Sequence, residues 1–118
     1  MFNFEKLDVW QKAITLADVI YNDTRSFPAD ERFGLTNQMR HSVVSVSSNI
    51  AEGSSRSSKS DFGRFVEIAT GSVFELVSQG FVARRQSFLT EEGFRAIYVN
   101  AEEIGRMLSG LRNSLMEG

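Results

Sequence analysis

Residues 91–115, EEGFRAIYVNAEEIGRMLSGLRNSL, contain the most regular apolar pattern in the chain. The pattern steps alternately by three and four positions, through Phe94, Ile97, Ala101, Ile104, Leu108, Leu111 and Leu115. This spacing keeps one side of a helix apolar over successive heptads. Thr90 is the expected N-cap, and Glu91 and Glu92 follow in the first turn, where the helix dipole favours negative charge. The stretch predicts a long helix with one face buried in a helical bundle.

Three earlier segments also have helical spacing. The first spans about residues 8–24, with Asp8 as the expected N-cap and two adjacent apolar stripes: Val9, Ala13, Leu16, Ile20 and Trp10, Ile14, Ala17, Tyr21. The second spans about residues 35–52 and should stop at Gly53, because glycine is common just after a helix C-terminus. The third spans about residues 59–88, with Ser58 and Asp61 forming a variant capping box at its start.

Residues 42–48, SVVSVSS, complicate the second helix. They are β-branched and partly alternating, which is typical of a strand. The apolar residues Leu35, Met39, Val43, Val46 and Ile50 keep the helical spacing on both sides of this stretch. We therefore expect a helix here.

Four helices with short connections predict an all-α fold, an antiparallel up-down four-helix bundle. With 118 residues, the chain has room for one core, so residues 1–118 are expected to form a single domain. Apolar residues make up 42% of the chain, which is typical of a folded protein. The N-terminal residues lack the apolar stretch of a signal peptide, and no apolar run approaches the roughly 18 residues of a membrane span. We expect a cytoplasmic protein with no membrane partner.

The third helix has more apolar surface than one core requires. One stripe comprises Phe62, Val66, Ala69, Val73 and Leu76, and a second comprises Phe74, Val77, Phe81 and Phe88. Soluble monomers rarely expose a large apolar patch. The second stripe is buried either against another helix of the same chain or in a neighbouring subunit. We expect the latter, with Phe74, Phe81 and Phe88 at an oligomer interface.

Catalytic and metal-binding patterns are sparse. His41 is the one histidine, the chain has no cysteine, and a di-iron bundle would need Glu-x-x-His motifs on two helices. No phosphate-binding glycine motif is present, and no serine is marked as a nucleophile. We expect no enzymatic activity, no cofactor and no metal.

Two polar groups remain as candidate sites. Gln38, Ser42, Ser45, Asn49 and Glu52 share one face of the second helix, and Glu75 lies in the apolar middle of the third. A buried carboxylate needs a partner, so we expect Gln38, Asn49, Glu52 and Glu75 to form a structural polar network with Arg40 or backbone donors. A subunit contact and an acid–base site are the alternatives.

The second group is cationic and comprises Arg40, Arg56, Lys59 and Arg64. Arg56 and Lys59 lie at the start of the third helix, where backbone N–H groups favour anions. They are candidate nucleic-acid or phosphate contacts, or else ordinary solvated charges beside a helix cap.

Five stretches of the chain match a known family in order and spacing. They are KLDVWQKA (6–13), FGLTNQMR (33–40), SNIAEGSSRSS (48–58), DFGRF (61–65) and IATGSVFEL (68–76). The chain resembles the four-helix-bundle proteins encoded within intervening sequences of bacterial 23S rRNA genes. This resemblance implies a left-handed bundle, a cyclic pentamer and no assigned catalytic role.

The family is also similar to the accessory proteins of diversity-generating retroelements, which bind nucleic acid and a reverse transcriptase through a basic surface. This chain departs from that pattern, because its net charge is −2 and it lacks dense Lys/Arg stripes. We expect a non-catalytic homo-oligomer with RNA or a nucleic-acid enzyme as its candidate partner. A protein-interaction scaffold without nucleic-acid binding is the alternative, followed by an uncharacterised enzyme.

Overall fold

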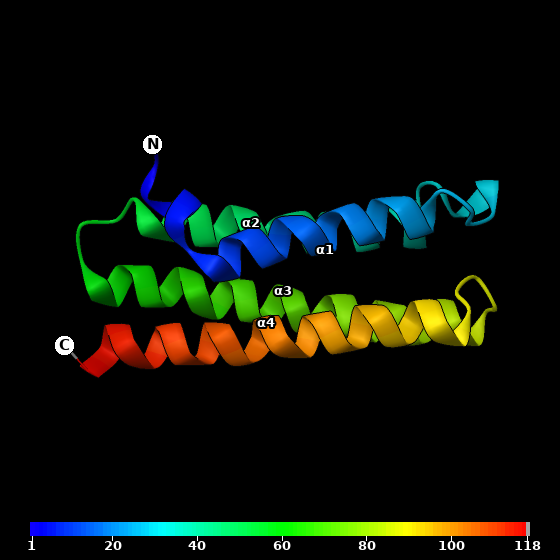
Figure 1. Ribbon diagram of the computed structural model, residues 1–118. Helices are drawn as coiled ribbons and strands as arrows, with labels where there is room; N and C mark the ends of the chain where they lie inside the picture. The colour runs from blue at the N-terminus through cyan, green and yellow to red at the C-terminus, as the bar shows by residue number, and fades with distance from the viewer. Residues whose placement is uncertain (118) are drawn as a thin grey trace.

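The structure is a computed structural model that describes residues 1–117 as four long helices with short connections. The helices are α1 (Asp8–Thr24), α2 (Leu35–Ser54), α3 (Lys59–Arg85) and α4 (Glu91–Glu117), and two short 3-10 helices, η1 (Asn3–Lys6) and η2 (Ala29–Glu31), precede α1 and α2. Each long helix runs back along the one before it (Figure 1). The predicted all-α bundle of four helices is confirmed, and residues 42–48 are helical.

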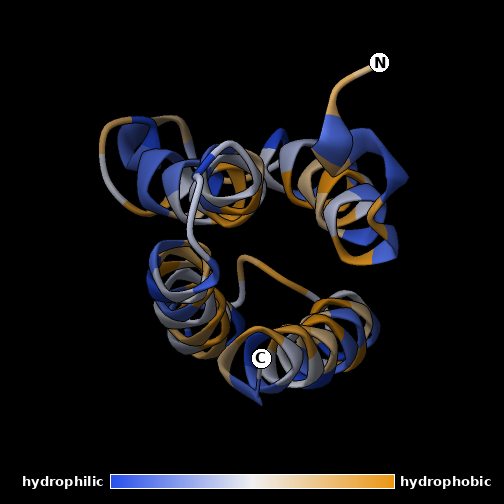
Figure 2. Cartoon of the chain, turned by 90° about the vertical axis from the view of Figure 1, so that its left-hand side faces the viewer, coloured by the Kyte–Doolittle hydropathy of each residue, from blue (hydrophilic) through white to orange (hydrophobic). Residues whose placement is uncertain are grey.

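The four helices form two layers, with α1 beside α2 and α3 beside α4 (Figure 2). Their apolar sides meet in one continuous core, in which Leu16, Val46 and Leu76 are fully or almost fully buried. The predicted stripe of α4 is buried from Phe94 to Leu108. Its last two members, Leu111 and Leu115, are only half-buried. The bundle is rod-shaped and measures 46 × 21 × 20 Å.

Local sequence signals fix the starts of α3 and α4. The Ser58 hydroxyl accepts a hydrogen bond from the Asp61 N–H at 3.0 Å, and the Thr90 hydroxyl accepts one from the Gly93 N–H at 3.0 Å. Both predicted caps are confirmed. The prediction for Asp8 was wrong, because Leu7 is the N-cap residue and Asp8 already lies in the first turn of α1.

Gly53 does not end α2, contrary to prediction. The helix continues to Ser54, and Gly53 is buried inside it. A Cβ at this position would lie 2.8 Å from the Phe65 Cβ and 2.9 Å from the Phe62 Cδ1. Glycine is needed here because α3 passes close to α2, not because the backbone turns.

α3 ends at Arg85, three residues before its predicted end at residue 88. Ser87 adopts a left-handed conformation with a φ of 64°. The Phe88 N–H donates to the Ala83 carbonyl at 2.9 Å, and the Ser87 N–H donates to the Arg84 carbonyl at 3.0 Å. These two bonds form a Schellman motif, which closes the helix and turns Phe88 out of the helical register.

By its length and composition alone, α3 is long and apolar enough to cross a membrane. This was not expected from the sequence. Core helices of soluble proteins share this property, and one side of α3 lies against α2 and α4. The high apolar content of α3 therefore has the same origin as its second apolar stripe: the helix carries more apolar residues than the core alone requires.

Candidate functional site

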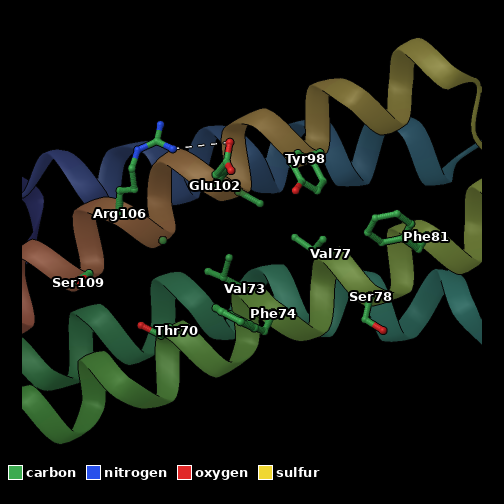
Figure 3. Close-up of a pocket in the computed structure, with 12 residues that line it drawn as sticks. Thr70, Val73, Phe74, Val77, Ser78, Phe81, Tyr98, Glu102, Arg106 and Ser109 are labelled. Carbon is green, nitrogen blue, oxygen red and sulfur yellow. Dashed lines mark ion pairs between the residues drawn. The ribbon is translucent and has the colours of Figure 1, made fainter.

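An open groove runs between α3 and α4 on the outer face of their layer (Figure 3). Its volume is about 720 Å³. The apolar lining comprises Val73, Phe74, Val77, Phe81, Tyr98 and Ala101. Polar side chains stand at the edges: Thr70 and Ser78 on α3, and Glu102, Arg106 and Ser109 on α4. We call this feature the α3–α4 groove.

The phenylalanines reach the groove because of their helical positions. Phe74 follows the buried Val73 and is therefore rotated from it by about 100°. Phe81 lies two turns further along the same side of α3. Phe74 is 71% exposed and Phe81 is 41% exposed. Phe74 and Phe81, which belong to the predicted interface stripe, therefore form an open apolar surface.

Phe88 does not belong to this surface, so that part of the prediction was wrong. The ring of Phe88 packs against Phe27, with the ring centroids 5.5 Å apart, and contacts the core. The cause is the Schellman turn at Ser87, which interrupts the helical spacing between Phe81 and Phe88.

The aromatic end of the groove is held by ring packing. Phe81 lies 4.7 Å from Phe94 and 6.2 Å from Tyr98, measured between ring centroids. The Arg84 guanidinium covers the Phe94 ring at 4.2 Å and forms a 3.1 Å ion pair with Glu91. These contacts hold Phe81 in place while leaving one side of its ring exposed.

The α4 wall is open because its side chains are small. Ala101, Gly105 and Ser109 follow one another along the wall, and a Cβ at Gly105 would meet no atom within 4 Å. At the edge, Glu102 and Arg106 form a loose ion pair at 3.6 Å, with both side chains more than half exposed. The wall can therefore admit another apolar side chain or a helix.

The sequence analysis missed the α4 side of this groove. Tyr98, Glu102, Gly105 and Ser109 step by four, three and four positions, so they lie on one face of α4. That spacing was visible in the sequence. It was overlooked because only Tyr98 in this series is strongly apolar.

The predicted polar network does not form. Gln38 and Glu75 are exposed, and Glu52 pairs with Arg56 at 2.8 Å on the surface. The Asn49 contacts stay within α2, where its amide donates to the Ser45 carbonyl at 2.8 Å and to the Ser45 hydroxyl at 3.1 Å. Glu75 lies on the side of α3 that faces solvent, so its side chain is exposed even though its neighbours in the sequence are apolar.

A smaller serine contact occupies the α2–α3 interface instead. The hydroxyls of Ser45 and Ser72 are 2.9 Å apart, and Ser42 and Ser72 are buried. Small polar residues let the two helices approach closely while satisfying their own hydrogen bonds. Only the middle of the polar stripe is therefore packed inside the bundle, through a Ser45–Ser72 contact in place of the predicted carboxylates, and its ends at Gln38 and Glu52 are exposed.

The four candidate cations are largely engaged within the chain. Arg56 pairs with Glu52, Arg64 pairs with Asp61 at 3.0 Å, and both guanidiniums cover the Phe65 ring. Arg40 lies on the other side of α2 and donates to the Thr24 hydroxyl at 2.9 Å. Lys59 is exposed at the start of α3. The structure does not bring the four cations to one anion site.

The ionisable residues elsewhere are mostly on the surface. His41 is exposed, and among residues 1–117 no cluster of three acidic or histidine side chains is placed to hold a metal ion. The hydrogen bond between Lys12 and Glu103 raises the pKa of Lys12 and lowers the pKa of Glu103. Partial burial raises the pKa of Asp23. None of these groups lines the α3–α4 groove.

Comparison with known proteins identifies the family of this chain. Residues 5–110 match the model of the 23S rRNA-intervening sequence protein family. A crystal structure from Bacteroides thetaiotaomicron, of a protein with unknown function from the S23 ribosomal protein family, has the same fold. It superposes with a TM-score of 0.82 at 24% identity and covers 89% of this chain and 95% of its own. No curated protein matches. The chain belongs to the 23S rRNA-intervening sequence protein family.

Proposed function

We propose that this protein is a non-catalytic subunit of a homo-oligomer that assembles through the α3–α4 groove. The observation that carries the proposal is the pair of exposed phenylalanines, Phe74 and Phe81, in the lining of an apolar groove of about 720 Å³. A surface of this kind on a soluble protein usually meets another protein. A closed ring of five copies is the assembly that the family resemblance implies.

The composition of the groove also favours a protein partner. Its lining is aromatic and aliphatic, with a few polar groups at the edge, which is the usual arrangement of a protein interface. Phe81 is fixed by Phe94 and Tyr98, so little side-chain entropy is lost when a partner covers it.

RNA, or an enzyme that acts on nucleic acid, is the second candidate partner, and the charges support it less well. Phosphate binding depends on free Lys and Arg side chains. Arg56 and Arg64 are paired with carboxylates, and the net charge of the chain is −2. Salt-sensitive RNA retention that is lost in Arg56→Ala with Lys59→Ala would reverse this preference.

The test of assembly is the molar mass in solution, measured by light scattering at micromolar concentration. We expect the parent protein to form a defined oligomer and Phe81→Glu to dissociate it while helicity is retained, because a carboxylate cannot be buried in an apolar interface without a partner. The matched control is Val82→Glu. Val82 is the next residue on α3, is 48% exposed and lies outside the groove, so this variant should assemble normally. A monomeric parent protein would contradict the proposal.

A further inference from the structure

A second apolar surface lies on the opposite layer of the bundle. On α1, Trp10, Ile14, Ala17 and Tyr21 step by four, three and four positions, and Val44 is exposed on α2, which packs against α1. Ile14 is 38% exposed, Tyr21 is 39% exposed and Val44 is 40% exposed. We call these five residues the α1–α2 patch.

The orientation of α1 places this patch on the outside. Its core stripe, from Val9 to Ile20, is buried. Lys12 pairs with Glu103 of α4 on one side of the helix, whereas Tyr21 lies under the Arg40 guanidinium of α2 on the other, 4.6 Å from its ring centroid. The stripe from Trp10 to Tyr21 therefore lies on the α2 side of α1. Its partly buried members, Trp10 and Ala17, pack against the edge of the core, whereas Ile14 and Tyr21 are exposed.

The patch and the groove lie on opposite faces of the molecule. α1 and α2 form one layer and α3 and α4 the other, so the outer faces of the layers point in opposite directions (Figure 2). A single copy cannot bring these two surfaces together, but two copies placed one behind the other can.

The two surfaces match in length. Trp10 and Tyr21 are separated along α1 by the same number of residues as Thr70 and Phe81 along α3, which is about 16 Å at 1.5 Å per residue. The patch presents helix side chains, and the groove is hollow with small residues on its α4 wall. Two grooves set face to face would leave unfilled space and lose dispersion contacts.

The charges at the edges also match. Among residues 1–117, neither Arg40 nor Asp18, one turn from Ile14, has an oppositely charged partner within 4.0 Å. Arg40 donates to the Thr24 hydroxyl, and its guanidinium has further N–H groups that can meet a carboxylate. The edge of the groove carries Glu102 and Arg106, which are joined only by the loose 3.6 Å pair. Each edge thus offers one carboxylate and one guanidinium to the other.

We infer that the α3–α4 groove of one copy receives the α1–α2 patch of the next copy, in a head-to-tail contact. The inference builds on the proposed function, because it requires self-association and adds the identity of the second surface. A contact between two different surfaces leaves one groove and one patch free at the ends of any short assembly. It therefore generates a closed ring or an open chain, whereas a pair of identical surfaces stops at a dimer.

Two complementary variants test the pairing. Phe81→Glu places a carboxylate in the groove and leaves the patch intact, whereas Ile14→Glu places a carboxylate in the patch and leaves the groove intact. Each variant alone should have the mass of one chain, 13.2 kDa. An equimolar mixture retains one intact groove–patch pair, so its mass should double to that of a heterodimer. Val82→Glu and Thr15→Glu, on the same helices but outside both surfaces, should assemble as the parent does.

The outcomes separate the two claims. A monomeric parent protein, or normal assembly of Phe81→Glu, would overturn the proposed function. Normal assembly of Ile14→Glu, or two monomeric variants that do not combine, would overturn only the head-to-tail inference. Circular dichroism on each variant checks that the helices are retained.

Cysteine cross-linking gives an independent measurement, because the chain has no cysteine of its own. Asp18→Cys on one copy and Ser109→Cys on another should form a cross-linked heterodimer with a short bis-maleimide. Ser109→Cys alone should give none. A Ser109→Cys homodimer would place two grooves against each other and overturn the inference.

Discussion

Replacing Gly53 by alanine tests how closely α2 and α3 pack. The new Cβ would lie 2.8 Å from the Phe65 Cβ and 2.9 Å from the Phe62 Cδ1. The Phe62 ring can rotate, but the Phe65 Cβ is attached directly to the α3 backbone, so the two helices must separate. Overpacking of this kind costs about 1–3 kcal/mol, and the better helix propensity of alanine returns up to about 1 kcal/mol. With the full offset, we expect a net loss of up to about 2 kcal/mol.

Gly71→Ala is the matched control for this substitution. Gly71 is an exposed residue in the middle of α3, and a Cβ there would meet no atom within 4 Å. The same substitution should therefore stabilise the protein by about 1 kcal/mol.

The assay is the midpoint of urea unfolding for the three proteins at one fixed concentration, because self-association adds to apparent stability. The midpoint should fall for Gly53→Ala and rise for Gly71→Ala. If Gly53→Ala raised the midpoint as Gly71→Ala does, α2 and α3 would not approach as closely as the structure has them.

Three further predictions concern stability. Leu108→Ala should lower the free energy of unfolding by about 2–5 kcal/mol in denaturant melts, because Leu108 is fully buried. Leu115→Ala should lower it clearly less, because Leu115 is only half-buried. A loss below about 0.5 kcal/mol for Leu108→Ala would mean that the apolar face of α4 is exposed. Ser87→Gly should raise stability by about 1 kcal/mol, since Ser87 has a φ of 64° and glycine adopts this conformation without a Cβ penalty; unchanged or lower stability would contradict the Schellman end of α3. The hydrogen bond to Lys12 lowers the pKa of Glu103 in the folded state. Glu103 therefore stabilises the fold at pH values above the ordinary carboxyl pKa, and this stabilisation is lost as the pH falls through the lowered folded-state pKa. The stability advantage of the parent over Glu103→Gln should accordingly shrink on acidification, and an advantage that grew would contradict the Lys12–Glu103 pair.

The sequence by itself determined the helices and their buried faces. Apolar residues at helical spacing were enough to place α1 and α4, because this pattern is local to each segment. The caps at Ser58 and Thr90 were also visible, since a cap involves residues only three positions apart. Part of the candidate site followed as well: Phe74 and Phe81 were recognised as surplus apolar surface.

Only the tertiary structure decided how these surfaces are used. The role of Gly53 depends on the approach of α3, and the exclusion of Phe88 from the stripe depends on the turn at Ser87 and on contact with Phe27. The exposure of Glu75 and the groove shared with Tyr98 likewise follow from how α3 and α4 are rotated within the bundle. A helical repeat shows which residues share a face, but whether that face meets another helix or solvent is set by packing between segments that are distant in the chain.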